Sequence, residues 1–309
     1  GYMSTRYALE RQGLEKVAVQ HHHAHAVACM AENHLDEPVL AITLDGTGYG
    51  TDGHIWGGEI LVAERSRFLR KAHLAYLPMP GGDAAVLEPW RMAVSILYRV
   101  LGQECLDLDL PLITQAGPEK LNFLIQMMDK NLNSPLTSST GRLFDGLSAL
   151  LGLCTTISYE SQAAMELEAL AGDLETDQVY DFTISEPRQT EEPDKPLEKI
   201  RQIDMMPGMD QIVRALLAKE TPARISAAFH ETLVKAFAQA ARITSLETGI
   251  RNVVLSGGVF NNQRIFTRMV KDLEHKGMTV FTHSAVPAGD GGISLGQAVA
   301  AAAMTGNAT

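Results

Sequence analysis

Four of the ten histidines of this chain stand within five positions, in the stretch Gln-His-His-His-Ala-His at 20–25. Val17 and Val19 predict a strand that ends before this stretch, and the apolar run AVACMAEN predicts a helix after it. On that helix His21 and His25 share one face, with Cβ atoms roughly 6 Å apart. Two imidazoles at this spacing can hold one divalent metal ion, with bonds of about 2.0–2.1 Å. The alternative is a polar helix start whose histidines are incidental, and the spacing alone favours neither.

Length and composition narrow the class of protein. A chain of 309 residues can bury a large core, and this length favours two subdomains over one. The net charge of −11 argues against a broad surface for nucleic acid. Cys29, Cys105 and Cys154 lie in apolar contexts without CxxC spacing, which predicts buried thiols in a reducing cytoplasm. No apolar run approaches the ~20 residues of a membrane span, and GYMSTRYALERQ lacks the apolar core of a signal peptide. We therefore expect a cytoplasmic protein that binds neither membranes nor nucleic acid.

Strands and helices alternate along the chain, which predicts an α/β fold. The apolar run 38–46 predicts a buried strand, 53–64 its partner, and 71–77 a third strand. A loop at 78–83 follows and is a candidate boundary. Residues 172–206 are rich in Asp, Glu and Pro, so we expect a surface excursion with two short strands. Helices are expected at 88–102, 118–130, 140–153, 160–171 and 222–247, and at the segment ISLGQAVAAAAM.

The first of three glycine-rich turns begins with Asp45, at the end of the first predicted strand. The glycines after it, among them Gly46 and Gly48, can bring backbone amides to a phosphate. The Asp45 carboxylate could also bind a metal. The alternative is a hairpin turn, for which Asp-Gly is a common signal.

The other two turns precede predicted helices. In the second, a strand meets Gly257 and Gly258 and is followed by Asn261 and Asn262, an arrangement that can place a nucleotide phosphate at a helix N-terminus. The alternative is a tight strand–helix connection with Asn as the cap. In the third, Asp290 stands among glycines and could bind a metal or cap the last helix. The order of the histidine pair and the three glycine-rich turns along the chain is more informative than any one of these motifs.

A family resemblance rests on long segments in a fixed order. They are VQHHHAHAVACMAEN, LDGTGYGTDGHIWGGEIL, YLPMPGGDAAVLEPWRMA, GRLFDGLSALLGL, YESQAAMELE, LSGGVFNNQ and GDGGISLGQA. Together they resemble the carboxy-terminal part of the HypF family, the carbamoyltransferases of [NiFe]-hydrogenase maturation. They are similar, more distantly, to the TsaD-like transferases that make threonylcarbamoyladenosine on tRNA.

This resemblance implies the actin-like, sugar-kinase-like (ASKHA) fold, in which two RNase H-like subdomains flank a nucleotide cleft. We expect the first subdomain at 1–85, joined by the last helix at 291–309, and the second, with helical insertions, at 86–290. YMSTRYALE resembles the segment after the module's first β-hairpin, so we expect a fragment that lacks this hairpin. The acylphosphatase-like, zinc-finger and YrdC-like domains of full-length relatives also have no counterpart in the sequence.

The family's metal ligands match His21, His25, Asp45 and Asp290, a set suited to zinc or iron. Their neighbours His22 and His23 are candidate catalytic residues that support the site or touch the substrate. Candidate nucleotide-binding residues are Gly46, Gly48, Asp145, Glu160, Gly257, Gly258, Asn261 and Asn262. For Asp145 the alternative is an ordinary exposed helix residue.

The resemblance also implies a reaction. A YrdC-like domain makes carbamoyl-adenylate from carbamoyl phosphate and ATP, and the adenylate then binds to this module. The C-terminal cysteine thiolate of HypE attacks the carbamoyl carbon and AMP leaves, while the metal acts as a Lewis acid. Magnesium is left open as a second cation. The alternatives are transfer to tRNA, and a non-catalytic module that docks HypE or nucleotide.

Overall fold

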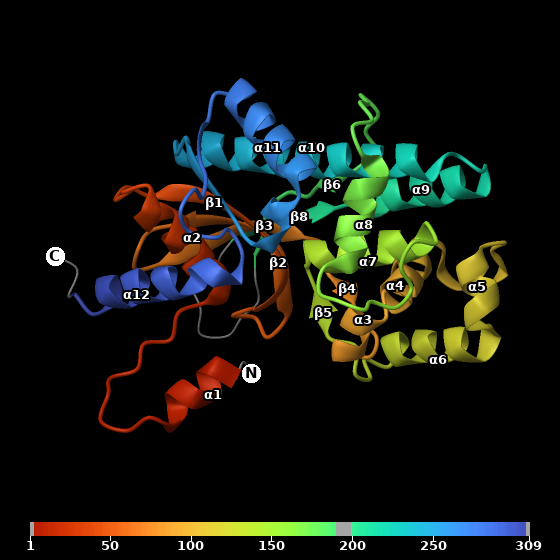
Figure 1. Cartoon of the computed structure of the whole chain (residues 1–309), viewed down its shortest axis with the longest axis horizontal. Coiled ribbons are helices and arrows are strands. Elements are labelled where there is room, and N and C mark those ends of the chain that lie inside the picture. Colours follow the sequence, from red (N-terminus) through yellow and green to blue (C-terminus); the bar gives the residue numbers. More distant parts are fainter. Residues whose placement is uncertain (1–2, 190–198, 307–309) are drawn as a thin grey trace.

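The computed structural model of the chain describes residues 3–189 and 199–306, and a mixed sheet runs through it (Figure 1). Its main path has the strand order β10-β9-β1-β2-β3-β8-β6. These strands are β1 Val39–Tyr49, β2 Ile55–Ala63, β3 Phe68–Leu74, β6 Thr183–Ile184, β8 Lys199–Asp204, β9 Asn252–Ser256 and β10 Thr279–Phe281. Off this path lie the short strands β4 Leu77–Pro78, β5 Leu136–Thr137 and β7 Arg188–Gln189.

Helices cover both faces of this sheet, which explains why β1 is apolar on both sides. Leu40 and Ile42 point into the larger core, with α4 Trp90–Leu101, α7 Thr140–Leu150 and α10 Pro222–Thr248. Val39 and Ala41 point to the opposite face and pack against α2 His21–Glu32 and α12 Ile293–Met304. The remaining helices are α1 Met3–Glu10, α3 Asp83–Leu87, α5 Pro111–Ala116, α6 Pro118–Asp129, α8 Gln162–Ala171, α9 Met206–Leu217 and α11 Gln263–His275, with the short 3-10 helices η1 Gly102–Asp107, η2 Gly258–Asn261 and η3 Asp290–Gly292.

The first predicted glycine turn lies inside a strand. β1 continues to Tyr49, and its pairing with β2 shifts register between Leu44 and Gly48. The interpretation of Asp45-Gly46 as a hairpin turn is therefore wrong, and the chain reverses after Tyr49, before β2 begins. An irregularity of this kind bends a strand and redirects its side chains. In this chain the irregularity falls at Asp45, whose carboxylate is a candidate metal ligand.

Two further expectations differ from the structure. The strand predicted at Val17 and Val19 is wrong, because residues 11–20 pair with no strand of the described sheet and are largely exposed. In the excursion 172–206 the two short strands β6 and β7 are present, but β8 was missed. Its pattern KIRQID reads as polar, yet β8 lies between β3 and β6 and buries Ile203 completely.

The burial of the cysteines and the length of the helices bear on two further predictions. All three cysteines are buried, as expected. Within the described residues, no helix is both long and apolar enough to cross a membrane. Residues 190–198 of the excursion, and 1–2 and 307–309 of the predicted first subdomain, lie outside the described residues. The subdomain limits stay predictions.

Candidate metal centre

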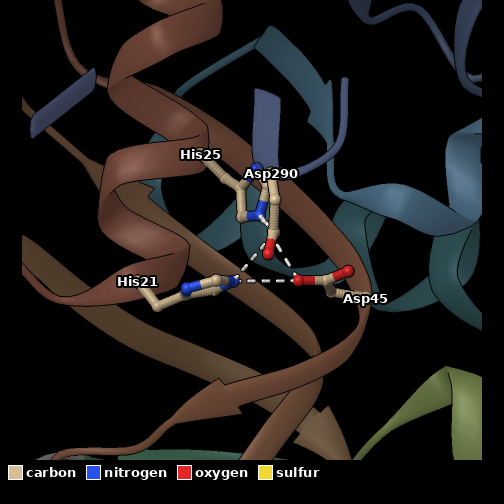
Figure 2. Close-up of side chains that lie close together, drawn as sticks. All are labelled: His21, His25, Asp45 and Asp290. Carbon is tan, nitrogen blue, oxygen red and sulfur yellow. Dashed lines mark hydrogen bonds and ion pairs between the residues drawn. The ribbon is translucent and has the colours of Figure 1, made fainter. Parts of the chain in front are cut away.

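Four side chains from three distant segments meet at one point (Figure 2). His21 and His25 lie on the first turns of α2, Asp45 lies in the irregular part of β1, and Asp290 begins η3. One ligand atom from each lies within 4.8 Å of the others. The structure therefore brings together all four predicted ligands.

The separations between these atoms suit a tetrahedral metal ion. Asp45 Oδ2 lies 2.9 Å from His21 Nε2 and 3.3 Å from His25 Nε2. Asp290 Oδ1 lies 3.6 Å and 3.5 Å from the same two nitrogens. Tetrahedral ligands with bonds of about 2.0–2.1 Å stand about 3.4 Å apart. Two imidazoles and two carboxylates at this spacing fit zinc or iron.

The start of α2 fixes the two histidines. Gln20 is the N-cap residue, with extended backbone, and its side chain accepts a hydrogen bond of 2.8 Å from the backbone N–H of His23. This cap places the first helical residue at His21, so that His25 follows one turn later on the same face. The two ring centroids are 4.9 Å apart.

Asp45 is held as a carboxylate by donors on both oxygens. His21 Nε2 lies 2.9 Å from Oδ2, and the backbone N–H of Gly258 donates to Oδ1 at 3.2 Å. Burial alone would raise the pKa of Asp45, but the hydrogen bonds from His21 and His25 hold it well below its usual range. Conversely, burial alone would lower the pKa of His25, but Asp290 and Asp45 raise it to about 9. A proton on His25 thus occupies the position that a metal cation would take.

Asp290 is the open side of the site. Its side chain is 72% exposed, whereas those of His21, His25 and Asp45 are 7%, 1% and 11% exposed. It points at both imidazoles (Figure 2), and the residue that precedes α12 is Gly292. The interpretation of Asp290 as the cap of the last helix is therefore wrong. The cluster is therefore open to solvent on the Asp290 side.

The Ser-Gly-Gly turn packs against the same part of β1. Gly257 has φ of +108°, and a Cβ atom there would lie 2.2 Å from the backbone oxygen of Leu44. Only glycine fits such an approach. The following residue, Gly258, contacts Asp45 through its N–H group. The second glycine turn therefore positions a predicted metal ligand, and its role toward nucleotide stays a prediction.

Asn262 has a structural task at this turn. Its Oδ1 accepts a hydrogen bond of 2.9 Å from the backbone N–H of Ile265, which caps α11, and its Nδ2 lies 3.0 Å from His230 Nε2. The capping alternative is thus confirmed for Asn262. Asn261 is exposed, at the end of η2.

The other predicted nucleotide residues lie on different elements. Asp145 is buried on α7, where its Oδ2 lies 2.6 Å from Arg142 Nε, so the alternative of an exposed residue is wrong. Glu160 is exposed in the turn before α8. A Cβ atom on Gly48 would lie 2.2 Å from His22 Cε1, whereas one on Gly46 would have open space. Nucleotide contacts of these four residues stay predictions.

His22 and His23 are fully buried. His23 Nε2 lies 2.7 Å from the backbone oxygen of Glu64. The His22 ring lies beside that of His21, with centroids 5.2 Å apart, and its Nε2 is 3.5 Å from Glu59 Oε2. Their direct part in a reaction stays a prediction.

The sequence motifs did not single out Glu59, which lies beside His22. This carboxyl is fully buried in β2, where it accepts hydrogen bonds from Arg70 at 3.0 Å and Ser138 at 2.6 Å. Burial raises its pKa to about 7 in spite of Arg70. An acidic residue inside the apolar strand IWGGEILVA was the signal that could have found it.

Comparisons with known proteins place the chain in one family. The family model described as "Carbamoyltransferase, Kae1-like Domain, second subdomain" matches residues 41–297, and the "HypF Kae1-like domain" model matches residues 1–32. The chain is 39% identical to carbamoyltransferase HypF2 of Cupriavidus necator, over 96% of this chain and 38% of that protein. It is 38% identical to a carbamoyltransferase HypF homolog of the same organism, over 93% of this chain and 71% of that protein.

Solved structures of this family have the same fold. A crystal structure described as full-length HypF in the phosphate- and nucleotide-bound form superimposes with a TM-score of 0.87, at 40% identity, over 97% of this chain and 45% of that one. HypF of T. kodakarensis gives 0.84, at 34% identity, over 100% of this chain and 40% of that one. The α/β fold expected from the resemblance is confirmed. The chain belongs to the HypF carbamoyltransferase family, of which it represents the Kae1-like part.

Proposed function

We propose that this chain transfers the carbamoyl group of carbamoyl-adenylate to a cysteine thiolate, the C-terminal cysteine of HypE in hydrogenase maturation. The observation that carries the proposal is the convergence of two imidazoles and two carboxylates beside the Ser-Gly-Gly turn. Membership of the HypF family supports carbamoyl as the group that is moved. The chain spans 38% and 45% of the length of two longer members of the family. We assign formation of the adenylate to a YrdC-like domain, as the family resemblance implies.

The chain's own residues would bind and orient the adenylate. We assign its AMP portion to the Gly257–Gly258 turn, because backbone N–H groups near a helix start favour phosphate oxygens. The carbamoyl group then lies toward Asp290, the exposed member of the cluster. A zinc or iron ion held by His21, His25 and the two aspartates would supply Lewis-acid polarisation of a carbamoyl or phosphate oxygen.

The bond changes are those of acyl transfer. The acceptor thiol gives its proton to solvent, its sulfur forms a bond to the carbamoyl carbon, and the bond from that carbon to the AMP oxygen breaks. The nucleophile comes from outside the chain, because burial raises the pKa of Cys29 to about 12 and that of Cys105 to about 11. Cys154 is also buried, with a raised pKa.

A single-turnover assay tests the proposal. The chain, loaded with zinc or iron, is mixed with synthetic carbamoyl-adenylate and HypE, and the thiocarboxamide is detected by mass spectrometry. We expect carbamoylated HypE and stoichiometric AMP in the presence of the chain. Adenylate binding without transfer would favour a docking module, and transfer only when tRNA is added would favour the tRNA-modifying alternative.

A further inference from the structure

A second group of polar side chains lies directly behind His25. Ser256 ends β9, His283 follows β10, and Glu32 ends α2. His283 Nε2 lies 2.9 Å from Ser256 Oγ, and His283 Nδ1 lies 2.9 Å from Glu32 Oε2. On its other side Ser256 Oγ lies 3.4 Å from His25 Nδ1. The chain of contacts thus runs from Glu32 to a predicted metal ligand.

A serine, a histidine and a glutamate in this order resemble the nucleophile triad of a hydrolase. Burial argues against that role, because Ser256 is 0% exposed. No substrate carbonyl can approach its hydroxyl while the strand keeps this position. The group therefore needs a task that is carried out inside the protein.

Glu32 lies at one end of this series of contacts, and its carboxylate sets the direction of the hydrogen bonds that lead through His283 and Ser256 to His25. An ionised carboxylate only accepts, so His283 must donate from Nδ1 to Glu32. Hydrogen bonds from the turn after His283 keep Glu32 ionised: burial would raise its pKa, but these bonds lower it to about 2. Burial lowers the pKa of His283 and favours the neutral ring, whose Nε2 then accepts the proton of Ser256.

The serine oxygen is then left as an acceptor for His25. The backbone oxygen of Ala288 is a competing partner for the serine proton, but it lies 3.3 Å from Ser256 Oγ, whereas His283 Nε2 lies 2.9 Å from it. With Ser256 donating to His283, the lone pairs of Ser256 face the Nδ1–H of His25. When an ion displaces the Nε2 proton of His25, the lone pair left on Nε2 faces the space shared with Asp45 and Asp290.

Glu32 also holds the segment that leads to Asp290. Its Oε1 accepts hydrogen bonds of 2.8 Å from both the backbone N–H and the hydroxyl of Ser284, and another from the N–H of Ala285. One carboxylate at the end of α2 thus contacts the segment that precedes the fourth ligand. The contact therefore links α2, which carries both candidate histidine ligands, to the segment before Asp290.

We propose that Glu32, His283 and Ser256 are positioning residues that set the tautomer and the orientation of His25 for metal binding through Nε2. The proposal rests on the metal site of the proposed function. Groups that hydrogen-bond the second ring nitrogen of a ligating histidine commonly fix its tautomer. Here three side chains from three elements do so in sequence, and a change at the far end is transmitted to the metal.

The decisive variant is Glu32→Gln, which keeps the size of the side chain. Its carbonyl oxygen can still accept from the Ser284 and Ala285 amides, so its NH2 group faces His283 Nδ1. That donor would move the His283 proton to Nε2 and reverse the chain of hydrogen bonds. We expect zinc affinity, measured by competition with a chromophoric chelator, to fall about 10- to 100-fold. Long-range 1H–15N NMR should show the His283 proton moving from Nδ1 to Nε2.

Ser256→Ala removes the contact to His25 at the near end and should weaken zinc binding to a similar extent, with the thermal transition retained. Glu274→Gln, at an exposed position of α11, makes the same chemical change away from the site and should bind zinc as the unmodified chain does. Equal affinities in the unmodified chain, Glu32→Gln and Ser256→Ala would overturn the positioning role alone. An unmodified chain that binds neither zinc nor iron would overturn the metal site and the proposed function as well.

Discussion

A Cβ atom added to Gly296 would lie 1.8 Å from the backbone oxygen of Ala24. Gly296 belongs to α12 and Ala24 to α2, so the missing side chain lets the two helices touch at their backbones. Figure 1 shows α12 lying along the same side of the sheet as α2. Because η3 leads directly into α12, this contact also sets how far Asp290 stands from the histidines.

Gly296→Ala should therefore push α12 away from α2. We expect a loss of about 1–3 kcal/mol in the free energy of unfolding, as for other overpacked contacts. Zinc affinity should fall as well, because Asp290 moves with the helix. Urea unfolding and zinc competition measure the two effects. Gln297→Ala, at the exposed neighbouring position, should change neither.

The second prediction concerns metal content. The purified chain should hold about one zinc or iron ion, because its donor set completes a four-coordinate site. His21→Ala removes one ligand and should lower the occupancy sharply, as measured by elemental analysis. His275→Ala, on an exposed turn of α11, should leave it unchanged. Full occupancy in a His21→Ala/His25→Ala chain would disprove the site.

Gly258→Val tests the Ser-Gly-Gly turn. A Cβ atom there would lie 3.1 Å from Asp45 Oδ1, and the rest of the valine would crowd the path of a phosphate. We expect weaker AMP binding in calorimetry, with the core intact. Gly257→Ala should instead destabilise the fold, because its Cβ would meet the Leu44 backbone. Unchanged AMP affinity in Gly258→Val would mean that the turn positions Asp45 but does not bind nucleotide.

Asp290→Ala separates chemistry from binding. The adenylate would keep its contacts with the glycine turn, but its carbonyl would be poorly placed. A misplacement of about 1 Å can cost roughly 100-fold in rate. Single-turnover transfer to HypE should therefore fall by about that factor, while AMP affinity changes little. Normal transfer together with normal metal content would remove Asp290 from the mechanism.

The last prediction concerns pH. Burial lowers the pKa of His230 to about 4, against about 6.5 in an unfolded chain. Between these values the unfolded chain binds a proton that the folded chain does not bind. The stability that the neutral ring contributes is thus complete above pH 6.5 and is lost as the pH falls toward 4. At pH 5 the loss is on the order of 2 kcal/mol.

Urea unfolding at pH 7 and pH 5 measures this loss, with His230→Gln as the comparison. Gln can replace the hydrogen bonds to Ser226 and Asn262 without titrating. The variant should lose less stability between the two pH values than the unmodified chain. An equal loss would show that other groups account for the acid sensitivity.

The elements that could be predicted from sequence are those that local patterns determine. The period of Ile225, Phe229 and Leu233 predicted a helix at 222–247, and α10 spans Pro222–Thr248. The spacing of His21 and His25 likewise placed both rings on one face of α2. Local patterns act within a few turns of the chain, and in these two helices tertiary contacts did not change the conformation that they favour.

Features that depend on distant neighbours were not predictable in this way. The register shift in β1 depends on how β2 and the Ser-Gly-Gly turn approach Asp45. The strand predicted at Val17 and Val19 had a suitable pattern but no neighbouring strand. Glu32 and His283 lie far apart in the sequence, and only the packing of α2 beside β10 brings them together. The set of four candidate ligands came from the family resemblance, since spacing alone linked only the two histidines.

The placement of Asp290 has a consequence for biosynthesis. A ribosome releases His21, His25 and Asp45 long before Asp290 and the helix that covers α2. A nascent chain can therefore offer an ion only three of the four ligands, while the face of α2 that α12 later covers is still bare. The fourth ligand and the docking of α12 therefore arrive together, so a chain that stalls before Asp290 would carry a site of three ligands, from which an ion would exchange readily.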